Sequence, residues 1–427
     1  MSNTRSSSQP PAALAAATVL ALTLTACGGD ASPEEGGDVE LRFAFWGTAD
    51  RADRFQEAID IFENENPGID VKPEVNDWDG YWDRLATVVA GGDIPDIMMQ
   101  EDRYIGEYAS RGVLADLSGS VPTDDVDAHL LSSGEIDGAQ YGYPTGSNVF
   151  SVVANPDMFE DAGVPMPDDS MWTWEEYVDI SNALSDGLDG QAFGTSDYSF
   201  AEVGFRVYAR QHGQALFTED GTLGYEDELL EEWFQRSLDL QESGGQPSAD
   251  QGLALDLLDS PIATGEAAMS LTWSAQLEVL SEATGTHLTL LRIPGESEFD
   301  QAGMYFKPGM YLAAAETSDH QTEAAQFIDF MINDTRVGEI FLSELGLPGN
   351  ANVREAVVAE LDTVDQVAAD FVTDLSDEIV DAAAVMPQGA SAAAEIMQRV
   401  NSEVLFEQIT PEEGAAKFRS ELEAALS

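Results

Sequence analysis

The N-terminal part of the chain alternates between strand and helix patterns. Large apolar residues occupy every second position from 39 to 45, which predicts a half-buried strand that ends at Trp46. The same periodicities then predict a helix over 49–65, a strand over 69–75, a helix over 79–90 and a strand over 95–99. This order of elements is typical of a parallel sheet with helices packed on it.

The loops that follow parallel strands lie at one edge of a sheet, and open α/β sheets bind ligands at that edge. We therefore expect side chains from three loops to meet there. These candidates are Trp46, Asp77, Trp78, Glu101, Asp102 and Arg103.

The rest of the chain also alternates between short strands and longer helices. Thr173, followed three residues later by Glu176, predicts the start of a helix. Further helices are predicted over 200–212, 226–243 and 322–332 and through about the last seventy residues. Strands are predicted over 149–153 and 287–293, within 305–315, and in a short segment that ends at Trp273.

The chain is strongly acidic, with 80 Asp and Glu residues, 18 Lys and Arg residues and a formal net charge of −62. Such a surface repels phosphate backbones and anionic lipid headgroups, which argues against nucleic acid as a partner. It also disfavours a phosphorylated or sulfated ligand, unless a well-placed arginine overrides the overall charge. We interpret the acidity as an aid to solubility in a salty medium. The length of 427 residues favours two lobes or domains over one core.

The first residues have the features of a secretory signal. Arg5 is the only charge before an apolar run over 12–24, which is too short to span a bilayer. The next segment, Leu24-Thr25-Ala26-Cys27, resembles the bacterial lipobox. The resemblance implies removal of a signal peptide, residues 1–26, and a diacylated Cys27 that ties the protein to the cell membrane outside the cytoplasm. Residues 27–38 then form the lipid-bearing end and a flexible tether, and Cys27, the only cysteine, has no partner for an internal disulfide.

Short motifs follow one another in a recognisable order from residue 24 to residue 345. After the lipobox they are Trp46-Gly47, residues 91–97, residues 112–117, residues 141–144, Asn155 with Phe159 and Gly163, residues 173–175, Gly265 with residues 267–269 and Trp273, and residues 324–325 with 327–328. This order resembles that of the extracellular solute-binding proteins of family 1, the sugar-binding group that includes maltose- and maltodextrin-binding proteins.

The resemblance implies a two-lobed α/β fold of the periplasmic-binding-protein type, in which each lobe is a mainly parallel sheet flanked by helices. Crossover strands join the lobes, and the ligand binds in the cleft between them. We expect lobe 1 to comprise residues 39–147 and 304–345, and lobe 2 residues 148–303 and 346–427. The resemblance also implies a sugar ligand, in particular an oligosaccharide, and the permease subunits of an ABC importer as partners. We expect a monomer.

Residues 101–104, followed by residues 108–112, are similar to a segment of maltodextrin-binding proteins in which an Asp-Arg pair hydrogen-bonds sugar hydroxyls. The similarity implies that Asp102 and Arg103 contact the ligand.

The other candidates follow from the chemistry of a pyranose. Aromatic rings cover its apolar face, and carboxylates, amides and guanidinium groups bind its rim of hydroxyls. Candidates for the face are Trp46, Trp78 and Trp273, and candidates for the rim are Glu101, Asp102, Arg103 and Asp77. Asn148 and Tyr305 lie near the two predicted crossovers. Core positions are predicted for Trp82, Trp174 and Trp233, whereas Trp172 fits either role.

The sequence contains no positive sign of an enzyme. Its four histidines are scattered, and it lacks H-E-x-x-H, G-x-S-x-G, P-loop and G-x-G-x-x-G patterns. We therefore expect a binding protein without a cofactor or metal. Two alternatives stay open: a binding protein for a non-sugar solute such as a polyol phosphate or a peptide, and an exported enzyme that acts on polysaccharide.

Overall fold

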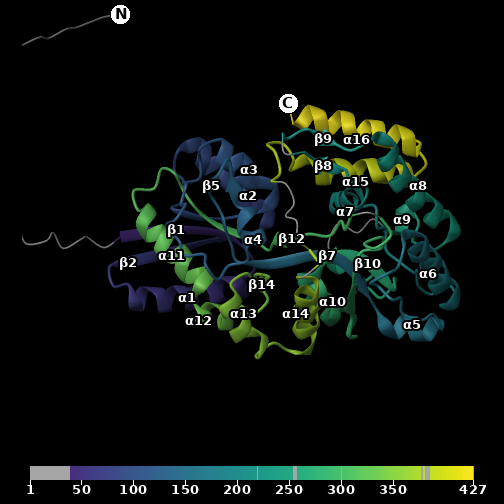
Figure 1. The fold of residues 1–427 in the computed structure, drawn as a ribbon, viewed down its shortest axis with the longest axis horizontal. Coiled ribbons are helices and arrows are strands. Elements are labelled where there is room, and N and C mark those ends of the chain that lie inside the picture. The colour runs from purple at the N-terminus through teal and green to yellow at the C-terminus, as the bar shows by residue number, and fades with distance from the viewer. Residues whose placement is uncertain are drawn as a thin grey trace, which may run out of the picture. The chain divides into compact units, whose positions relative to one another are not determined.

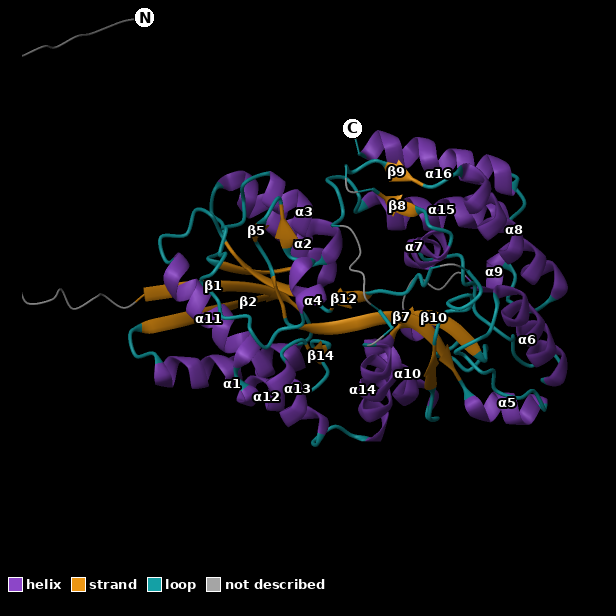
Figure 2. Ribbon diagram, in the orientation of Figure 1, coloured by secondary structure: helices purple, strands orange, loops and turns teal. Residues whose placement is uncertain are grey.

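The computed structural model of the chain describes residues 39–218, 220–252, 257–299, 301–376, 378–379 and 385–426 (Figures 1 and 2). The predicted signal peptide, lipobox and tether, including Cys27, lie outside these ranges. Residues 38–427 group into one compact unit. Within the described ranges, every helix is too short or too polar for a transmembrane span.

The N-terminal strands belong to a five-stranded sheet in the order β2-β1-β3-β13-β6. Its strands are β1 (Val39–Trp46), β2 (Ile69–Asn76), β3 (Ile97–Gln100), β6 (Tyr143–Pro144) and β13 (Tyr311–Ala314). β1 pairs in parallel with β2 and β3, whereas β13 runs antiparallel to β3 and β6. The predicted parallel arrangement of the first three strands is confirmed, so their carboxyl ends share one edge.

Helices pack on this first sheet through a core of aromatic rings. The elements around it are α1 (Ala49–Glu65), α2 (Trp78–Gly91), α3 (Asp102–Ser110), α4 (Ala128–Ser132), β4 (Glu135–Ile136), β5 (Ala139–Gln140), α11 (Gln321–Asn333) and α12 (Thr335–Phe341). The ring of Phe43 on β1 lies edge-on to Phe55 of α1 and Phe327 of α11, with centroids 5.1 and 5.4 Å apart. These contacts fix both helices to the strand that ends at Trp46.

The second sheet is built around β7 (Gly146–Ala154), the long strand in the middle of Figure 1. Its partners are β10 (Met269–Trp273), β11 (Thr289–Leu291), β12 (Phe306–Pro308) and β14 (Leu347–Pro348). All four pairings are antiparallel, so the prediction of a mainly parallel sheet in each lobe is wrong for this one. A long helical stretch separates β7 from β10, so no short right-handed crossover imposes a parallel direction.

Most of the remaining helices surround the second sheet. They are α5 (Pro156–Ala162), α6 (Trp174–Gly187), α7 (Glu202–Gln211), α8 (Asp227–Ser243), α9 (Ala249–Gly252), α10 (Leu277–Thr284), α14 (Thr363–Leu375), α15 (Ala392–Leu405) and α16 (Pro411–Ala425), with the short turns η1 (Leu257–Asp259) and η2 (Ser274–Gln276) and the hairpin β8 (Ala215–Phe217) and β9 (Leu223–Gly224). The predicted start of α6 is confirmed: Thr173 accepts a hydrogen bond from the Glu176 amide, and the Glu176 carboxylate accepts one from the Thr173 amide. Trp174 and Trp233 are buried, as predicted.

The buried apolar residues form two separate clusters, one for each sheet, and β7, β12 and β14 lie where the chain passes between them. The predicted lobe boundaries fall in or beside these strands and stay a prediction. α13 (Ala351–Val358) contacts both sides of this division: Val353 and Val357 lie close to Gly338 of α12, whereas Val358 packs against the cluster of the second sheet.

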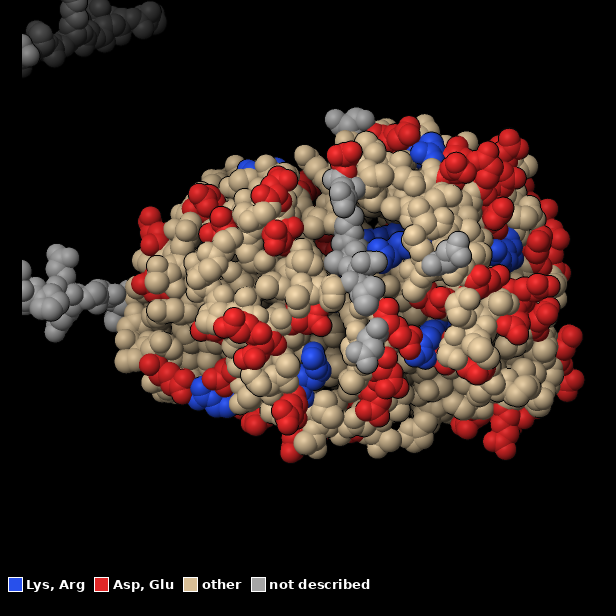
Figure 3. Space-filling view, viewed as in Figure 1, with Lys and Arg blue, Asp and Glu red and all other residues tan. Residues whose placement is uncertain are grey.

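Asp and Glu side chains are spread over the face drawn in Figure 3, whereas Lys and Arg form a few separate spots. One basic spot lies in a hollow near the middle of that face (Figure 3). The scarce cations of this chain are therefore not confined to its outer surface.

Candidate functional site

Aromatic rings crowd the carboxyl edge of the first sheet. Trp46 lies edge-to-face against Trp78, with ring centroids 5.0 Å apart, and also contacts Tyr81 and Trp82. It is 8% exposed, so its neighbours cover the ring that we expected to meet a ligand. Trp82 is buried as predicted and stacks on Tyr104 at 3.7 Å. Trp46 therefore packs the edge of the sheet against Trp78, Tyr81 and Trp82.

Asp77 and Trp78 lie at the start of α2. The exposed Asp77 is the N-cap, because its carboxylate accepts a 2.8 Å hydrogen bond from the Gly80 amide. Trp78 is half-buried, and the guanidinium carbon of Arg103 lies 5.6 Å from its ring centroid. Trp78 therefore adjoins the predicted site through Arg103, whereas Asp77 serves the helix.

Glu101 is the centre of a buried charge cluster at the start of α3. One carboxylate oxygen lies 2.5 Å from Nζ of Lys307, and the other lies 3.1 Å from Nε of Arg103 and accepts the Arg103 amide at 2.8 Å. Burial alone would raise the pKa of Glu101, but the two cations and these hydrogen bonds lower it to about 2. Glu101 is therefore an anion that Lys307 and Arg103 share.

This cluster predicts a specific loss of stability in acid. The pKa of folded Glu101 lies below its ordinary value of 4.5, so its contribution is complete above that pH and is lost as the pH falls towards about 2. We expect the free energies of unfolding of the wild type and Glu101→Gln to differ by a constant amount above pH 5. The difference should shrink between pH 4.5 and pH 2.5, measured by urea unfolding. A difference that does not depend on pH would contradict the ion pairs.

Asp102 connects α3, which packs with the first sheet, to α7, which packs with the second. Its carboxylate oxygen lies 3.3 Å from Nη1 of Arg206 on α7, and both side chains are about nine-tenths buried. Asp102 does not pair with Arg103, although the two are adjacent and both were predicted to bind the ligand. The sequence neighbours thus carry separate ion pairs, Arg103 with Glu101 and Asp102 with Arg206 on α7.

Tyr305 lies behind this ion pair. The guanidinium carbons of Arg206 and Arg210 are 5.0 and 5.3 Å from its ring centroid. The ring is 2% exposed, and its hydroxyl makes no hydrogen bond with any residue that the structure describes. Burial raises the pKa of Tyr305. Tyr305 therefore helps to hold two arginines in place through its ring.

A cavity of about 160 Å³, which we call the charged cavity, opens between these elements. Six ionisable side chains line it: Glu101, Asp102 and Arg103 at the start of α3, Glu202 and Arg206 on α7, and Lys307 on β12. The rings of Phe150, Phe200 and Trp273 line it as well. Elements packed on both sheets, and the strand β12, therefore contribute to one site.

Several polar atoms of the charged cavity have hydrogen-bonding capacity to spare. Glu202 is 6% exposed and makes no ion pair or hydrogen bond within the described ranges. Arg103 uses Nε for Glu101, while its two terminal nitrogens bond to none of the described residues. The Glu202 carboxylate, an acceptor, and the Arg103 guanidinium, a donor, thus line the same cavity.

Trp273 ends β10 and lines the charged cavity, as expected for a residue that stacks on a ligand. It is half-buried and lies edge-to-face against Phe150, with centroids 5.1 Å apart. Nζ of Lys307 lies 4.8 Å from its ring centroid. Asn148 supports this corner from behind, because its side-chain oxygen accepts hydrogen bonds from Ser274 at 2.8 Å and from the Ala275 amide at 3.1 Å.

Of the nine predicted ligand residues, Glu101, Asp102, Arg103 and Trp273 line the charged cavity together. Trp46, Asp77, Trp78, Asn148 and Tyr305 lie around it without lining it. Sequence reasoning missed Glu202, Arg206 and Lys307. A usable signal existed for one of these, since Lys307 is one of only three lysines and belongs to a predicted crossover.

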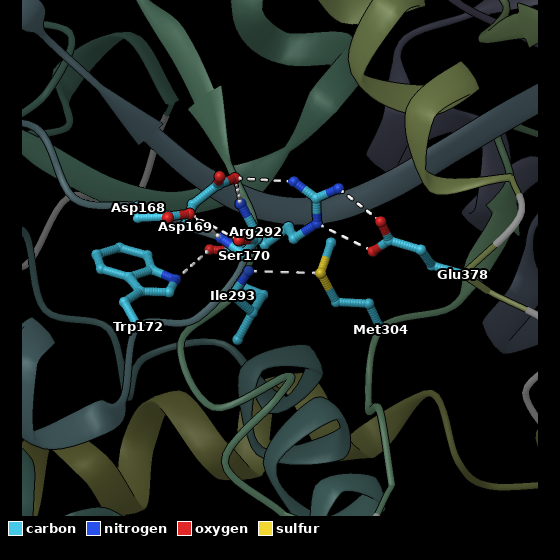
Figure 4. Close-up of polar contacts among 8 residues, drawn as sticks. All are labelled: Asp168, Asp169, Ser170, Trp172, Arg292, Ile293, Met304 and Glu378. Atoms are coloured by element: carbon cyan, nitrogen blue, oxygen red, sulfur yellow. Dashed lines mark hydrogen bonds and ion pairs between the residues drawn. The ribbon is translucent and has the colours of Figure 1, made fainter.

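A second charge network, drawn in Figure 4, shares no residue with the lining of the charged cavity. Arg292 forms two hydrogen bonds to Glu378, at 2.8 and 3.0 Å, and its amide and side chain bond to Asp169. Trp172 donates to the Arg292 carbonyl at 3.1 Å and is 3% exposed. Trp172 is thus a core residue, and the network ties three distant segments of lobe 2 together.

We expect Arg292→Ala to lower the free energy of unfolding by about 2 kcal/mol, because hydrogen bonds to charged groups at two carboxylates are lost. Arg336→Ala is the matched control, since Arg336 also joins two carboxylates, Asp334 and Glu65, but lies on the exposed surface. We expect Arg336→Ala to lower the free energy of unfolding by less than Arg292→Ala does. Urea unfolding of the three proteins measures both effects, and equal losses would contradict a structural role for the Arg292 network.

A family model described as bacterial extracellular solute-binding protein matches residues 57–370. A putative binding protein from Brucella abortus is 27% identical over 199 residues, 45% of this chain, and the match spans about half (47%) of that relative's length. A maltooligosaccharide ABC transporter solute-binding lipoprotein from Streptococcus pneumoniae is 23% identical over 365 residues, 80% of this chain and 81% of the relative.

Solved structures match over nearly the whole chain. An extracellular solute-binding protein of family 1 from Alicyclobacillus acidocaldarius is 25% identical with a TM-score of 0.73, covering 92% of this chain and 100% of the other. A Listeria monocytogenes ABC substrate-binding protein in complex with cycloalternan is 21% identical with a TM-score of 0.77, covering 91% and 98%. The predicted two-lobed α/β fold and the predicted family are confirmed, and both are those of binding proteins. The chain belongs to the bacterial extracellular solute-binding proteins.

Proposed function

We propose that this protein binds a sugar, in particular an oligosaccharide, in the charged cavity. The observation that carries the proposal is that the Glu202 carboxylate and the terminal nitrogens of Arg103, which have no partner among the described residues, line one cavity with Trp273. A sugar hydroxyl both donates and accepts hydrogen bonds, so a site for it needs acceptors and donors side by side. The indole of Trp273 offers a surface for the apolar face of the ring.

Relatives support a carbohydrate as the ligand class. The Listeria protein is in complex with cycloalternan, and a Yersinia enterocolitica protein, 22% identical with a TM-score of 0.77, is in complex with saturated digalacturonic acid. The Streptococcus relative is named for maltooligosaccharide. These ligands differ from one another, so the specificity here depends on the residues of this chain's own cavity.

The lobes proposed from the sequence, residues 39–147 with 304–345 and residues 148–303 with 346–427, close around the ligand. Residues at the start of α3 come from one lobe and residues of α7 from the other, so a ligand in contact with both stabilises the closed state. The connecting strands β7, β12 and β14 provide the hinge. The closed monomer then delivers the sugar to the permease subunits of an ABC importer, without a cofactor and without contact to nucleic acid.

The proposed location is the outer face of the cell membrane. Signal cleavage before Cys27 and diacylation of its thiol anchor the protein, and residues 28–38 serve as the tether. Mass spectrometry of the protein from a membrane fraction tests this step. Loss of residues 1–26 with two or more acyl chains on Cys27 supports it, and an unmodified Cys27 contradicts it.

A thermal-shift screen with mono-, di- and oligosaccharides, followed by chromatography of the recovered sugars, tests the function. We expect a higher melting temperature with at least one oligosaccharide, which is recovered intact. Turnover at catalytic rates would instead indicate an enzyme. Stabilisation only by polyol phosphates or peptides would assign a non-sugar solute.

A further inference from the structure

The charged cavity is small for an oligosaccharide. Its volume of about 160 Å³ lies below the roughly 300 Å³ at which sites for small molecules usually begin. A larger cavity of about 340 Å³, which we call the second cavity, adjoins it, because the two share five lining residues: Phe150, Phe200, Ala201, Trp273 and Gln398. The two cavities together reach the size of a small-molecule site, so an oligosaccharide held in the charged cavity extends into the second.

The second cavity offers hydrogen bonds from uncharged groups. The Ser196 hydroxyl lines it, is buried and has no partner among the described residues. The Ser270 hydroxyl, the side-chain nitrogen of Gln276 and the side-chain amide of Gln398 line it as well, and no described residue bonds to them. Uncharged donors and acceptors are therefore free to bind the hydroxyls of a sugar there.

Aromatic rings form another part of the wall of the second cavity. Phe150, Phe200 and Trp273 line it, and so does Tyr198, whose hydroxyl donates to the Trp233 carbonyl at 3.0 Å. Such rings cover the apolar face of a pyranose, while the hydroxyl and amide groups bind its rim. The second cavity thus has the chemistry that a sugar unit needs.

The two cavities differ in charge. Among the described residues that line the second cavity, Asp197 is the only aspartate, glutamate, lysine, arginine or histidine. Its carboxylate already accepts hydrogen bonds from the amide and hydroxyl of Ser199, at 2.9 and 2.7 Å, and from the side-chain amide of Asn401 at 2.6 Å. An anionic group of a ligand would lose its water there, find no described cation as a partner and lie near another carboxylate.

We propose that the ligand spans both cavities and that its unit in the second cavity is an uncharged sugar, not a uronic acid. The inference deepens the proposed function and rests on it, because it assumes that a sugar binds beside Glu202 and Arg103. The charged cavity lies between elements of both sheets, whereas the described lining of the second cavity belongs to elements that pack with the second sheet. Those elements, β10, α15 and the segment before α7, therefore select the neutral unit.

Isothermal titration calorimetry with three kinds of probe tests the inference. The probes are the neutral disaccharides maltose, cellobiose and α-1,4-galactobiose, their monosaccharides, and their dicarboxylates, in which both hydroxymethyl groups are oxidised. For galactobiose the dicarboxylate is digalacturonic acid. At least one neutral disaccharide should bind about tenfold or more tightly than its monosaccharide, because the second unit adds hydrogen bonds and ring contacts. Its dicarboxylate should bind about tenfold or more weakly than the disaccharide itself, because one carboxylate enters the second cavity.

Three variants locate the effect. Ser196→Ala combined with Ser270→Ala should weaken disaccharide binding about fivefold or more and leave the monosaccharide affinity unchanged, because two hydroxyls of the second cavity are lost. Ser110→Ala combined with Ser132→Ala removes two exposed hydroxyls of α3 and α4 and should bind as the wild type does. Gln398→Lys adds a cation and should reduce the preference for the neutral disaccharide about fivefold or more. Circular dichroism checks that all three variants fold.

The outcomes separate this inference from the proposed function. Neutral disaccharides that bind no more tightly than their monosaccharides would overturn the second sugar position and leave the charged cavity as the sugar site. A dicarboxylate that binds as tightly as its neutral disaccharide would overturn the selection against acidic sugars. Unchanged disaccharide affinity in the Ser196→Ala and Ser270→Ala variant would also overturn the inference. If no sugar of the wider screen binds, the proposed function fails and this inference fails with it.

Discussion

Trp273→Ala should weaken the binding of the protein's sugar by a factor of ten or more. The indole lines the charged cavity, and Phe150 and Lys307 lie against its ring. Its loss removes about 1.5–3 kcal/mol of apolar burial, and a loss of about 1.4 kcal/mol is already tenfold in affinity. Calorimetry with the sugar identified in the screen measures the change.

Two controls separate stacking from general damage. Trp273→Phe keeps an aromatic face and should lose less affinity than Trp273→Ala. Phe406→Ala removes an aromatic ring that is 43% exposed beyond the end of α15, and it should bind as the wild type does. If Trp273→Ala binds the sugar with wild-type affinity, Trp273 does not contact the sugar.

The strand and helix boundaries near the N-terminus could be predicted closely because local periodicity determines them. The predicted helix over 49–65 is α1, and the predicted strand that ends at Trp46 is β1. The parallel order of β1, β2 and β3 follows from the short connections between them. The shared edge, and the position of Glu101 to Arg103 on it, could therefore be predicted from the sequence.

The direction of the second sheet could not be predicted in this way. β7 meets β10, β11, β12 and β14 after long stretches of chain, and no local rule fixes how such strands pair. The same limit applies to the packing of α13 on α12, which depends on the close approach of Val353 and Val357 to Gly338.

The ion pairs of the site could not be predicted from the sequence either. With 80 acidic residues, almost any arginine has many possible partners, so adjacency suggested a joint role for Asp102 and Arg103. In the fold, Asp102 pairs with Arg206, 104 positions away, and Glu101 pairs with Lys307, 206 positions away. Trp46 is a related case. The sequence predicts correctly that it ends β1, but not that the rings of α2 cover its indole.

Glu101→Ala should lower the free energy of unfolding by about 3 kcal/mol or more, the largest loss of stability expected at the site. Glu101 is 4% exposed, and it balances Lys307 and Arg103 at once. Removal of one partner from a buried ion pair costs about 3–5 kcal/mol, because the remaining charge is left without compensation. Urea unfolding at neutral pH measures the loss.

Glu107→Ala on the same helix is the matched control for Glu101→Ala. Glu107 pairs with Arg111 at 2.9 Å, four residues on, but this pair is accessible to water. Exposed ion pairs contribute at most about 1 kcal/mol to stability. The free energies of unfolding of the two alanine variants should therefore differ by about 2 kcal/mol or more, because only the Glu101 pairs are buried. If Glu101→Ala lowers the free energy of unfolding no more than Glu107→Ala does, water reaches Lys307 and Arg103 freely. The charged cavity would then be a solvated surface, and its carboxylates and guanidinium groups would have no advantage over the rest of this acidic protein in holding a sugar.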